Sequence, residues 1–332
     1  MTDPPTVAIV GLGKMGLVHG SAVTVAGGRI VGLVDRQRKT LGNARWVGLQ
    51  APFFNSLDEL FSVQVPDAVF VSVPSNANLA VARACRATGV RAIFLEKPLA
   101  NTTERADELV RIAGEDSLID GVGFMLRHVP TFRHALRLLG DGAIGEVREV
   151  QAEAFMDAKL PAHGSWFRRR ATSGGGALTS LGSHLLSLLD AALGPTTSVE
   201  AADLTALPGQ VEDRARATVC YPDGARATLS VGWDVPGYEA MHVGLVFEGS
   251  DGHLAVDLER VVLTQATGRR AWTERQLPDD APGFVGGRGY VRQDAQFLAA
   301  VTGAQAERVT WDEGARIQHG LADLYRAAEA VR

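Results

Sequence analysis

Six residues near the N-terminus constrain the fold more than any other feature of this chain. The sequence GLGKMG at Gly11–Gly16 is a GxGxxG pattern that ends one apolar run and opens a segment with helical spacing, and an acidic residue, Asp35, ends the next apolar run. This context predicts a Rossmann dinucleotide-binding turn. Gly11 permits the tight turn, Gly13 lets a pyrophosphate approach the backbone, and Gly16 lets the helix pack on the strand.

The chain up to residue 124 alternates short apolar runs with amphipathic segments. Such alternation predicts a parallel, right-handed βαβ sheet with helices on both faces, and we assign residues 1–124 to this dinucleotide-binding domain. The predicted strands are Thr6–Gly11, Arg29–Asp35, Asp67–Val73, Arg91–Leu95 and Leu118–Phe124, and the predicted helices are Lys14–Ala26, Gln37–Gly48, Asn76–Thr88 and Thr102–Gly114.

After Pro130 the pattern changes to longer alternating stretches separated by turn sequences. This half, residues 125–332, is predicted to be an α/β domain with a largely antiparallel sheet and helices on one face. The predicted strands are Glu146–Met156, Val199–Ala206, Arg214–Tyr221, Ala225–Trp233, His242–Glu248 and His253–Leu258. The predicted helices are Thr131–Leu139, Ala177–Leu193, Gln293–Val301 and Asp312–Val331.

Composition excludes several classes of function. Hydrophobic residues make up 46% and charged residues 21% of the 332 residues, as in globular proteins with a real core. The formal net charge of −5 argues against nucleic acid or an anionic membrane as the main partner. No apolar stretch approaches the roughly 20 residues that span a bilayer, the N-terminus lacks a signal-peptide pattern, and Cys85 and Cys220 have no CxxC spacing, so we expect a cytoplasmic protein.

The acidic residue of the fingerprint predicts which dinucleotide binds. Asp35 is expected to accept hydrogen bonds from the adenosine ribose and to repel the 2′-phosphate of NADP, which favours NAD. Arg36, Arg38 and Lys39 follow directly and would pair with that phosphate. NAD is therefore the predicted cofactor, with NADP left open.

A lysine lies just beyond a predicted strand end, where ligands bind in open α/β sheets. Glu96-Lys97-Pro98 follows the strand Arg91–Leu95, and Pro98 biases the backbone of Lys97 towards an extended conformation. A partly desolvated Lys97 has a lowered pKa and is able to orient or shuttle a hydroxyl proton. The alternative interpretation is a solvated lysine at a strand end.

A histidine emerges from a glycine-rich segment in the second half. If a regular helix starts near Gly176, His184 shares one narrow strip with small side chains, which leaves room for a ligand. Imidazole takes up a proton near neutral pH, as the oxidation of an alcohol requires. The alternative is a buried helix histidine. The eight histidines show no zinc-type spacing, so no metal is predicted. The strip comprises Ala177, Ser180, His184, Ser187 and Ala191.

Taken together, these motifs resemble the Gfo/Idh/MocA family, the glucose–fructose oxidoreductase and inositol dehydrogenase group. The resemblance rests on Gly11–Gly16 with Asp35, Glu96-Lys97-Pro98, Gly123-Phe124…Arg127…Pro130, and Gly174-Gly175-Gly176…His184. It implies a Rossmann domain joined to an α/β domain whose open sheet often forms dimer or tetramer contacts. It also implies reversible hydride transfer between the nicotinamide and a sugar or cyclitol carbinol.

The resemblance assigns roles to individual residues. Lys97 matches the catalytic lysine, often followed by a cis proline, Glu96 matches a residue lining the nicotinamide site, and His184 matches the catalytic histidine. The predicted cofactor contacts are Gly11, Leu12, Gly13, Lys14, Met15, Gly16, Asp35, Arg36, Val73, Pro74, Asn78, Glu96 and Lys97. The predicted substrate contacts are Arg127, His128, Trp166, Arg168, Ser180 and His184, for which a surface arginine and a core tryptophan are the competing interpretations.

Three positions depart from the family pattern. Ser180 stands where many members carry an aspartate, Met125 replaces an asparagine, and Asn78 replaces a histidine. Serine holds no negative charge, so a carboxylate-assisted proton relay is in doubt. The leading hypothesis is an NAD(H)-dependent dehydrogenase or ketoreductase for a sugar, cyclitol or glycoside. The alternatives are an NAD-dependent glycosidase that uses transient oxidation and elimination, and a dinucleotide-sensing regulator.

Overall fold

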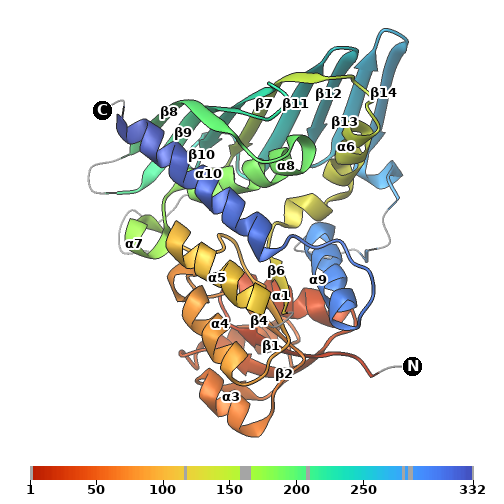
Figure 1. Ribbon diagram of the computed structural model, residues 1–332. Coiled ribbons are helices and arrows are strands. Elements are labelled where there is room, and N and C mark those ends of the chain that lie inside the picture. Colours follow the sequence, from red (N-terminus) through yellow and green to blue (C-terminus); the bar gives the residue numbers. More distant parts are fainter. Residues whose placement is uncertain are drawn as a thin grey trace. The chain divides into compact units, whose positions relative to one another are not determined.

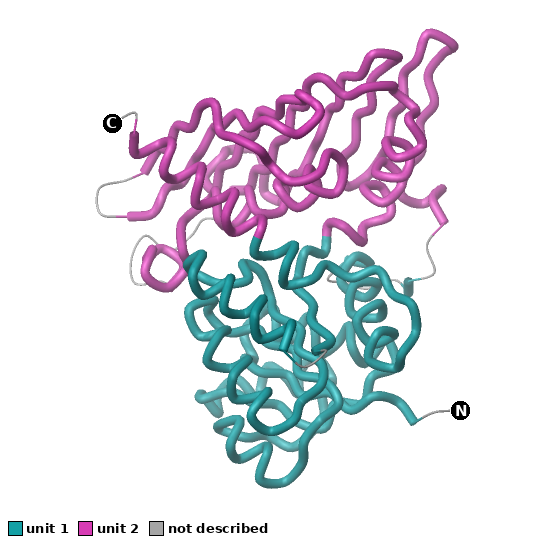
Figure 2. The backbone as a smooth tube through the Cα atoms, in the orientation of Figure 1, with its two compact units in different colours: residues 1–125, 281–315 teal, residues 126–280, 316–332 magenta. Residues whose placement is uncertain are grey.

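The chain divides into two compact units. The computed structural model describes residues 3–115, 118–157, 166–206, 210–278, 281–282 and 287–330. Unit 1 comprises residues 1–125 and 281–315, and unit 2 comprises residues 126–280 and 316–332 (Figure 2).

Unit 1 contains a six-stranded sheet in the order β3-β2-β1-β4-β5-β6, and every strand pairs in parallel with its neighbours. The sheet reverses its direction of growth between β1 and β4, which is where doubly wound sheets bind ligands. The strands are β1 (Thr6–Val10), β2 (Arg29–Val34), β3 (Phe53–Phe54), β4 (Ala68–Val71), β5 (Ala92–Leu95) and β6 (Ile119–Val122). The predicted Rossmann fold is confirmed.

Helices cover both faces of this sheet (Figure 1). Strands β1, β4 and β5 are apolar along almost their whole length because neither face meets water. The helices are α1 (Lys14–Val25), α2 (Thr40–Trp46), α3 (Leu57–Val63), α4 (Asn78–Ala87), α5 (Thr103–Glu115) and α9 (Arg288–Val301), with the start of α10 (Trp311–Ala330).

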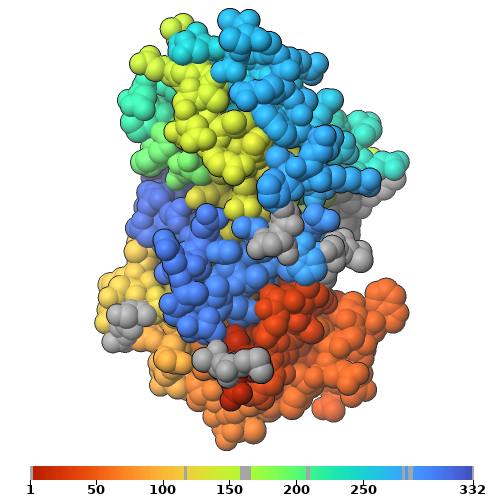
Figure 3. Space-filling model, turned by 90° about the vertical axis from the view of Figure 1, so that its right-hand side faces the viewer, coloured from red at the N-terminus to blue at the C-terminus, as the bar shows by residue number. Residues whose placement is uncertain are grey.

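A late segment of the chain returns to complete the core of unit 1. Phe297 and Leu298 of α9 lie in the same buried cluster as Phe70 and Phe94 of the sheet. Figure 3 shows this segment at the surface, where blue atoms border the red N-terminal residues, in agreement with the packing of α9 on α1. The first division between the units falls after residue 125. Residues 281–315, assigned to the second domain from the sequence, belong to unit 1 because α9 supplies core side chains there.

Unit 2 contains an eight-stranded sheet in the order β14-β13-β12-β11-β7-β10-β9-β8. All pairs are antiparallel except β7 with β10, which confirms the predicted, mainly antiparallel sheet. The strands are β7 (Val147–Phe155), β8 (Ser198–Ala206), β9 (Glu212–Cys220), β10 (Arg226–Gly232), β11 (His242–Gly249), β12 (Gly252–Asp257), β13 (Arg260–Gln265) and β14 (Gly268–Thr273).

The helices of unit 2 pack on one face of its sheet. Helix α6 contacts β12 and β13, and α8 contacts β7. Along β7, Val150, Ala152 and Ala154 are buried on this face, and Glu149, Gln151 and Glu153 are exposed on the other. The helices are α6 (Pro130–Gly140), α7 (Arg170–Ser173), α8 (Ser183–Leu193) and the end of α10.

Several elements were not predicted from the sequence, among them β3, α3, α7, β13 and β14. The segment Phe53–Val63 holds the two-residue strand β3 and the short helix α3, which are too brief for a periodic pattern. Strands β13 and β14 extend the second sheet beyond the six predicted strands. Residues Gly268–Ala271 of β14 are exposed, since this is an edge strand, so the apolar alternation that marks a half-buried strand is absent.

Candidate active site

The glycine turn between β1 and α1 uses its three glycines differently. Gly11 has φ +87°, and a Cβ added there would lie 2.6 Å from the carbonyl oxygen of Ser72. A Cβ on Gly16 would lie 1.8 Å from the carbonyl oxygen of Gly11, whereas a Cβ on Gly13 would meet nothing within 4 Å. Gly11 and Gly16 are therefore required by the fold, while the open space over Gly13 fits the close approach of a pyrophosphate.

Asp35 ties this turn to the end of β2. One carboxylate oxygen accepts a hydrogen bond from the Leu12 backbone N–H at 2.8 Å, and the other accepts one from the Gln37 N–H at 2.8 Å. The Leu12 side chain is buried in the core. Lys14 and Met15 begin α1, where the backbone N–H groups have no acceptor within the helix and are suited to bind phosphate.

The basic residues after Asp35 are exposed. The side chains of Arg36 and Lys39 lie at the surface. The Arg38 guanidinium lies 5.8 Å from the centre of the Phe53 ring. Asp35 is therefore the acidic group held against the glycine turn, as the prediction for NAD requires. Val73 and Pro74, just past β4, are half-buried, and Val73 adjoins Gly11.

We expect Asp35→Asn to shift cofactor preference towards NADP. The amide oxygen still accepts from the Leu12 N–H of the glycine turn, the amide NH2 no longer accepts from the exposed Gln37 N–H, and the negative charge is removed. The ratio of kcat/KM for NADP to that for NAD should rise about tenfold, because one repulsive charge near the ribose is worth about 1.4 kcal/mol. Steady-state kinetics with both cofactors measure this ratio, and an unchanged ratio would show that Asp35 does not face the ribose.

The Glu96-Lys97-Pro98 turn follows β5 directly, and the Lys97–Pro98 peptide bond is cis. Asn78, the first residue of α4, lies beneath this turn. Its side-chain N–H donates to the Leu99 carbonyl at 3.0 Å and lies 3.5 Å from the carbonyls of Glu96 and Pro98. Asn78 is 1% exposed, so its side chain holds the turn in place.

Lys97 is partly buried at the carboxyl end of the sheet. Burial lowers the pKa of its ammonium group, and the negative charge of Glu96 opposes part of that shift. A lysine with a lowered pKa at this edge is chemically suited to hold or pass a hydroxyl proton.

In unit 2, one buried carboxylate caps the segment that leads to His184. An oxygen of Glu212 accepts hydrogen bonds from the N–H groups of Gly176 at 2.9 Å and Leu178 at 3.0 Å, and from the Tyr325 hydroxyl at 2.7 Å. Burial raises the pKa of Glu212. The glutamate thus satisfies backbone donors at a helix start that water does not reach.

The same cluster explains two of the three consecutive glycines. A Cβ on Gly175 would lie 1.9 Å from the Tyr325 hydroxyl oxygen, and a Cβ on Gly176 would lie 2.0 Å from the Glu212 carbonyl oxygen. The Thr179 hydroxyl completes the cluster at 2.9 Å from the Tyr325 oxygen. The glycines therefore allow the segment that leads to α8 to pack against β9 and α10.

Glu212→Ala is expected to lower the free energy of unfolding by about 2–4 kcal/mol, because it removes the buried acceptor shared by two backbone N–H groups and the Tyr325 hydroxyl. Glu212→Gln keeps one acceptor oxygen and should lose less than half of that amount. Urea unfolding of both variants measures the difference. Equal stability of wild type and Glu212→Ala would contradict the capping role.

The helix that carries His184 is not regular. Leu178–Gly182 forms a π-helical turn before α8 begins at Ser183. The wider turn changes the angular position of Ser180 relative to His184, so the single strip predicted for a regular helix does not hold. His184 is 6% exposed and Ser187 is 1% exposed, while Ser180 is partly exposed.

The predicted substrate residues of unit 2 have distinct surroundings. The Arg127 guanidinium donates to the Ser187 carbonyl at 3.2 Å, one turn beyond His184 on α8. Arg168 is buried and contacts Gln210 at 2.7 Å and Asp213 at 3.2 Å. These partners balance the charge of Arg168 within the unit. His128 is buried, and Trp166 is 43% exposed.

The fold brings the predicted cofactor residues to one edge of the unit 1 sheet. They follow the carboxyl ends of β1, β2, β4 and β5, which are neighbours in the strand order. The predicted substrate residues lie in unit 2, so Lys97 and His184 belong to different units. Their joint action in one site stays a prediction.

The sequence prediction missed several buried polar residues. His19 of α1 contacts Asp294, 275 positions later, and Glu212 contacts Tyr325 across 113 positions. A weak signal exists for His19: it lies three residues after Gly16 and so shares the helix face that packs on the sheet. Nothing in the sequence indicates its distant partner.

The described residues include neither a metal-binding cluster nor a membrane-spanning helix. No three His, Cys, Asp or Glu side chains are grouped in a way that would hold a metal ion. No helix in the described part of the chain combines the length and the apolar character needed to cross a bilayer.

Comparison with known proteins agrees with this architecture. 1,5-Anhydro-D-fructose reductase from Ensifer adhaerens is 28% identical over 283 residues, which are 82% of this chain and 81% of that protein. 2,7-Anhydro-N-acetylneuraminate hydratase from Mediterraneibacter gnavus is 33% identical over 174 residues, 51% of this chain and 44% of that protein. The crystal structure of GenD2 from gentamicin A biosynthesis in complex with NAD has a TM-score of 0.84 and 27% identity, covering 100% of this chain and 96% of that chain.

Two family models match successive parts of the chain. Residues 6–124 match the oxidoreductase family with an NAD-binding Rossmann fold, and residues 132–255 match the GFO/IDH/MocA C-terminal domain. The first match contains the glycine turn, Asp35 and the Glu96-Lys97-Pro98 turn, and the second contains the glycine triplet and His184. The chain therefore belongs to the Gfo/Idh/MocA family of oxidoreductases and has an NAD-binding Rossmann domain.

Proposed function

We propose that this protein is an NAD(H)-dependent dehydrogenase or reductase that acts on a secondary hydroxyl or ketone of a sugar, cyclitol or glycoside. The observation that carries the proposal is the edge of the unit 1 sheet, where the open backbone at Gly13, the carboxylate of Asp35 and the partly buried Lys97 follow strands that lie side by side. The similarity to a 1,5-anhydro-D-fructose reductase supports a sugar-like substrate.

Lys97 and His184 have different roles in the proposed reaction. When bound, NAD supplies the acceptor for the hydride. Lys97, with its lowered pKa, orients the reacting oxygen and stabilises charge on it, and His184 takes up or returns the hydroxyl proton. Ser180 cannot carry charge, so in this protein the histidine works without an aspartate at that position. Glu212 and Tyr325 hold the start of the helix that bears His184.

A screen of alcohols tests the proposal. The purified enzyme is incubated with NAD and a panel of inositols, aldoses, anhydro sugars and glycosides, and the absorbance of NADH is followed. We expect at least one polyol to reduce NAD in a manner that saturates with substrate. Tight binding of NAD without turnover on the whole panel would exclude the dehydrogenase and favour a dinucleotide-sensing role.

A second candidate is a glycosidase or lyase that oxidises its substrate only transiently. The similarity to 2,7-anhydro-N-acetylneuraminate hydratase favours this possibility over other non-dehydrogenase chemistries. Such an enzyme consumes no net cofactor. Release of an aglycone without accumulation of NADH would identify it, whereas NADH formation in step with substrate oxidation would exclude it.

We also propose that the protein is a homodimer or homotetramer through the open face of the unit 2 sheet. This face carries a shallow groove lined by Gln151, His242, Val246, His253 and Thr264, among others. In Figure 1 the helices of this unit lie on the opposite face. Light scattering on the purified protein measures the assembly, and a monomer at micromolar concentration would contradict the proposal.

A further inference from the structure

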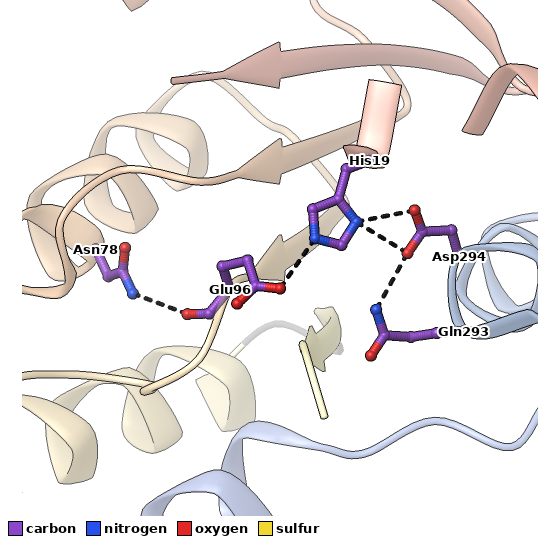
Figure 4. A network of polar contacts seen from close by, with 5 residues as sticks. All are labelled: His19, Asn78, Glu96, Gln293 and Asp294. Carbon is purple, nitrogen blue, oxygen red and sulfur yellow. Dashed lines mark hydrogen bonds and ion pairs between the residues drawn. The ribbon is translucent and has the colours of Figure 1, made fainter. Parts of the chain in front are cut away.

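A histidine with a carboxylate on each side is buried in unit 1. His19 of α1 is 0% exposed, its Nδ1 lies 2.9 Å from an oxygen of Asp294, and its Nε2 lies 3.1 Å from an oxygen of Glu96. Figure 4 shows the imidazole between the two acids, which come from α9 and from the end of β5. The two acids raise the pKa of His19, which favours the doubly protonated ring that donates to both carboxylates.

His19, Asp294 and Glu96 form a triad whose surroundings strengthen the interactions between its charged groups. Burial by itself would lower the pKa of His19, but Asp294 and Glu96 together raise it to about 10. The other titratable groups near the triad are Tyr290 of α9 and Lys97, next to Glu96 in the chain. The rings within 6 Å of the imidazole centre are those of Phe70, Phe94 and Tyr290. In so apolar a place, the attraction between opposite charges is only weakly screened.

Glu96 is restrained from several directions. Its backbone N–H donates to the Val71 carbonyl at 2.9 Å, which continues the pairing of β5 with β4. Its carboxylate forms a hydrogen bond with His19. Gly123 lies next to the same carboxylate oxygen, and a Cβ added to Gly123 would lie 2.8 Å from it. Gly123 therefore leaves just enough space for this side chain, and His19 decides where in that space the carboxylate points.

We propose that His19 is a positioning residue for the nicotinamide site, which acts by fixing the carboxyl group of Glu96 beside Lys97. The inference rests on the proposed function, in which Glu96 and Lys97 belong to that site. A purely structural contact between α1 and α9 would be made more cheaply by apolar side chains.

A double-mutant cycle separates positioning from a structural role. We expect His19→Gln to lower kcat about 10- to 100-fold, since a displacement of about 1 Å at a reacting group has effects of this size, and to leave the Kd for NAD within about threefold. If His19 acts through Glu96, the double variant His19→Gln, Glu96→Gln has the same kcat as Glu96→Gln alone. A structural role predicts instead that the two losses multiply.

Asp120→Ala is the matched stability control, because it leaves the buried Trp311 N–H without this acceptor. The Asp120 carboxylate is buried in the same unit and accepts a hydrogen bond from the Trp311 backbone N–H, and it belongs to neither the triad nor the glycine turn. This variant should lower Tm as His19→Gln does, and it should keep the wild-type kcat. A loss of kcat that follows Tm across both variants would overturn the inference.

A measurement without turnover tests the charge of the ring. We expect ¹⁵N NMR of histidine-labelled protein without NAD to show both ring nitrogens of His19 protonated at about pH 8, where an ordinary histidine is neutral. A neutral ring at that pH would overturn the inference. An unchanged kcat in His19→Gln would also contradict the positioning role, and it would leave the dehydrogenase proposal intact. If the wild-type enzyme oxidises no alcohol, both the dehydrogenase proposal and the positioning role are wrong.

Discussion

We expect alanine at either Lys97 or His184 to lower kcat by about 10²- to 10⁴-fold, the usual contribution of a general acid or base. Lys97→Ala removes the partly buried amine that orients the reacting oxygen, and His184→Ala removes the imidazole that exchanges the proton. Neither side chain is part of the glycine turn, so the Kd for NAD should stay within a few-fold of the wild-type value. Steady-state kinetics and fluorescence titration with NAD measure the two quantities.

Lys97→Met is the informative companion variant. Methionine keeps the length and apolar stem of the lysine, so a loss of kcat in this variant is a loss of the amine itself and not of packing. If Lys97→Met or His184→Ala turned over substrate at the wild-type rate, that residue would have no part in the chemistry. Unchanged turnover in both would remove the proposed site.

The second large effect is expected at the glycine turn, where one alanine substitution should weaken NAD binding and another should destabilise the fold. Gly13 has φ −71° and open space around an added Cβ, so Gly13→Ala should fold normally. The methyl group occupies the space over the backbone, and the Kd for NAD should rise about 100-fold, the equivalent of one or two charge-assisted hydrogen bonds at about 1.5–3 kcal/mol each.

Gly16→Ala should instead damage the fold. Its Cβ would lie 1.8 Å from the Gly11 carbonyl oxygen, which is backbone and has little freedom to move. We expect the free energy of unfolding to fall by about 1–3 kcal/mol, as for overpacked cores, with weaker NAD binding as a consequence. Urea unfolding and NAD titration of both variants distinguish the cases. An intact Kd in Gly13→Ala would mean that the cofactor does not approach this backbone.

The hydrophobic pattern of the sequence was sufficient to predict the long strands and helices. The long apolar strands and amphipathic helices of unit 1 were predictable because each buries a stripe or face that the sequence displays. The edge elements β3 and β14 were not, since a two-residue strand and an exposed edge strand have no such face. The π-helical turn before His184 was also not predictable, because it depends on how the glycine segment packs on Glu212 and Tyr325.

By itself, the sequence determined the Rossmann turn and the parallel and antiparallel halves, because short-range spacing and strand ends specify them, and it predicted roles for Asp35, Lys97 and His184. Only the tertiary structure decided that α9 returns to the first unit, that Asn78 holds the lysine turn, and that His19 lies between Glu96 and Asp294. These contacts join positions up to 275 residues apart. Their partners are chosen by the shape and low polarity of the folded core, which no local stretch of sequence contains.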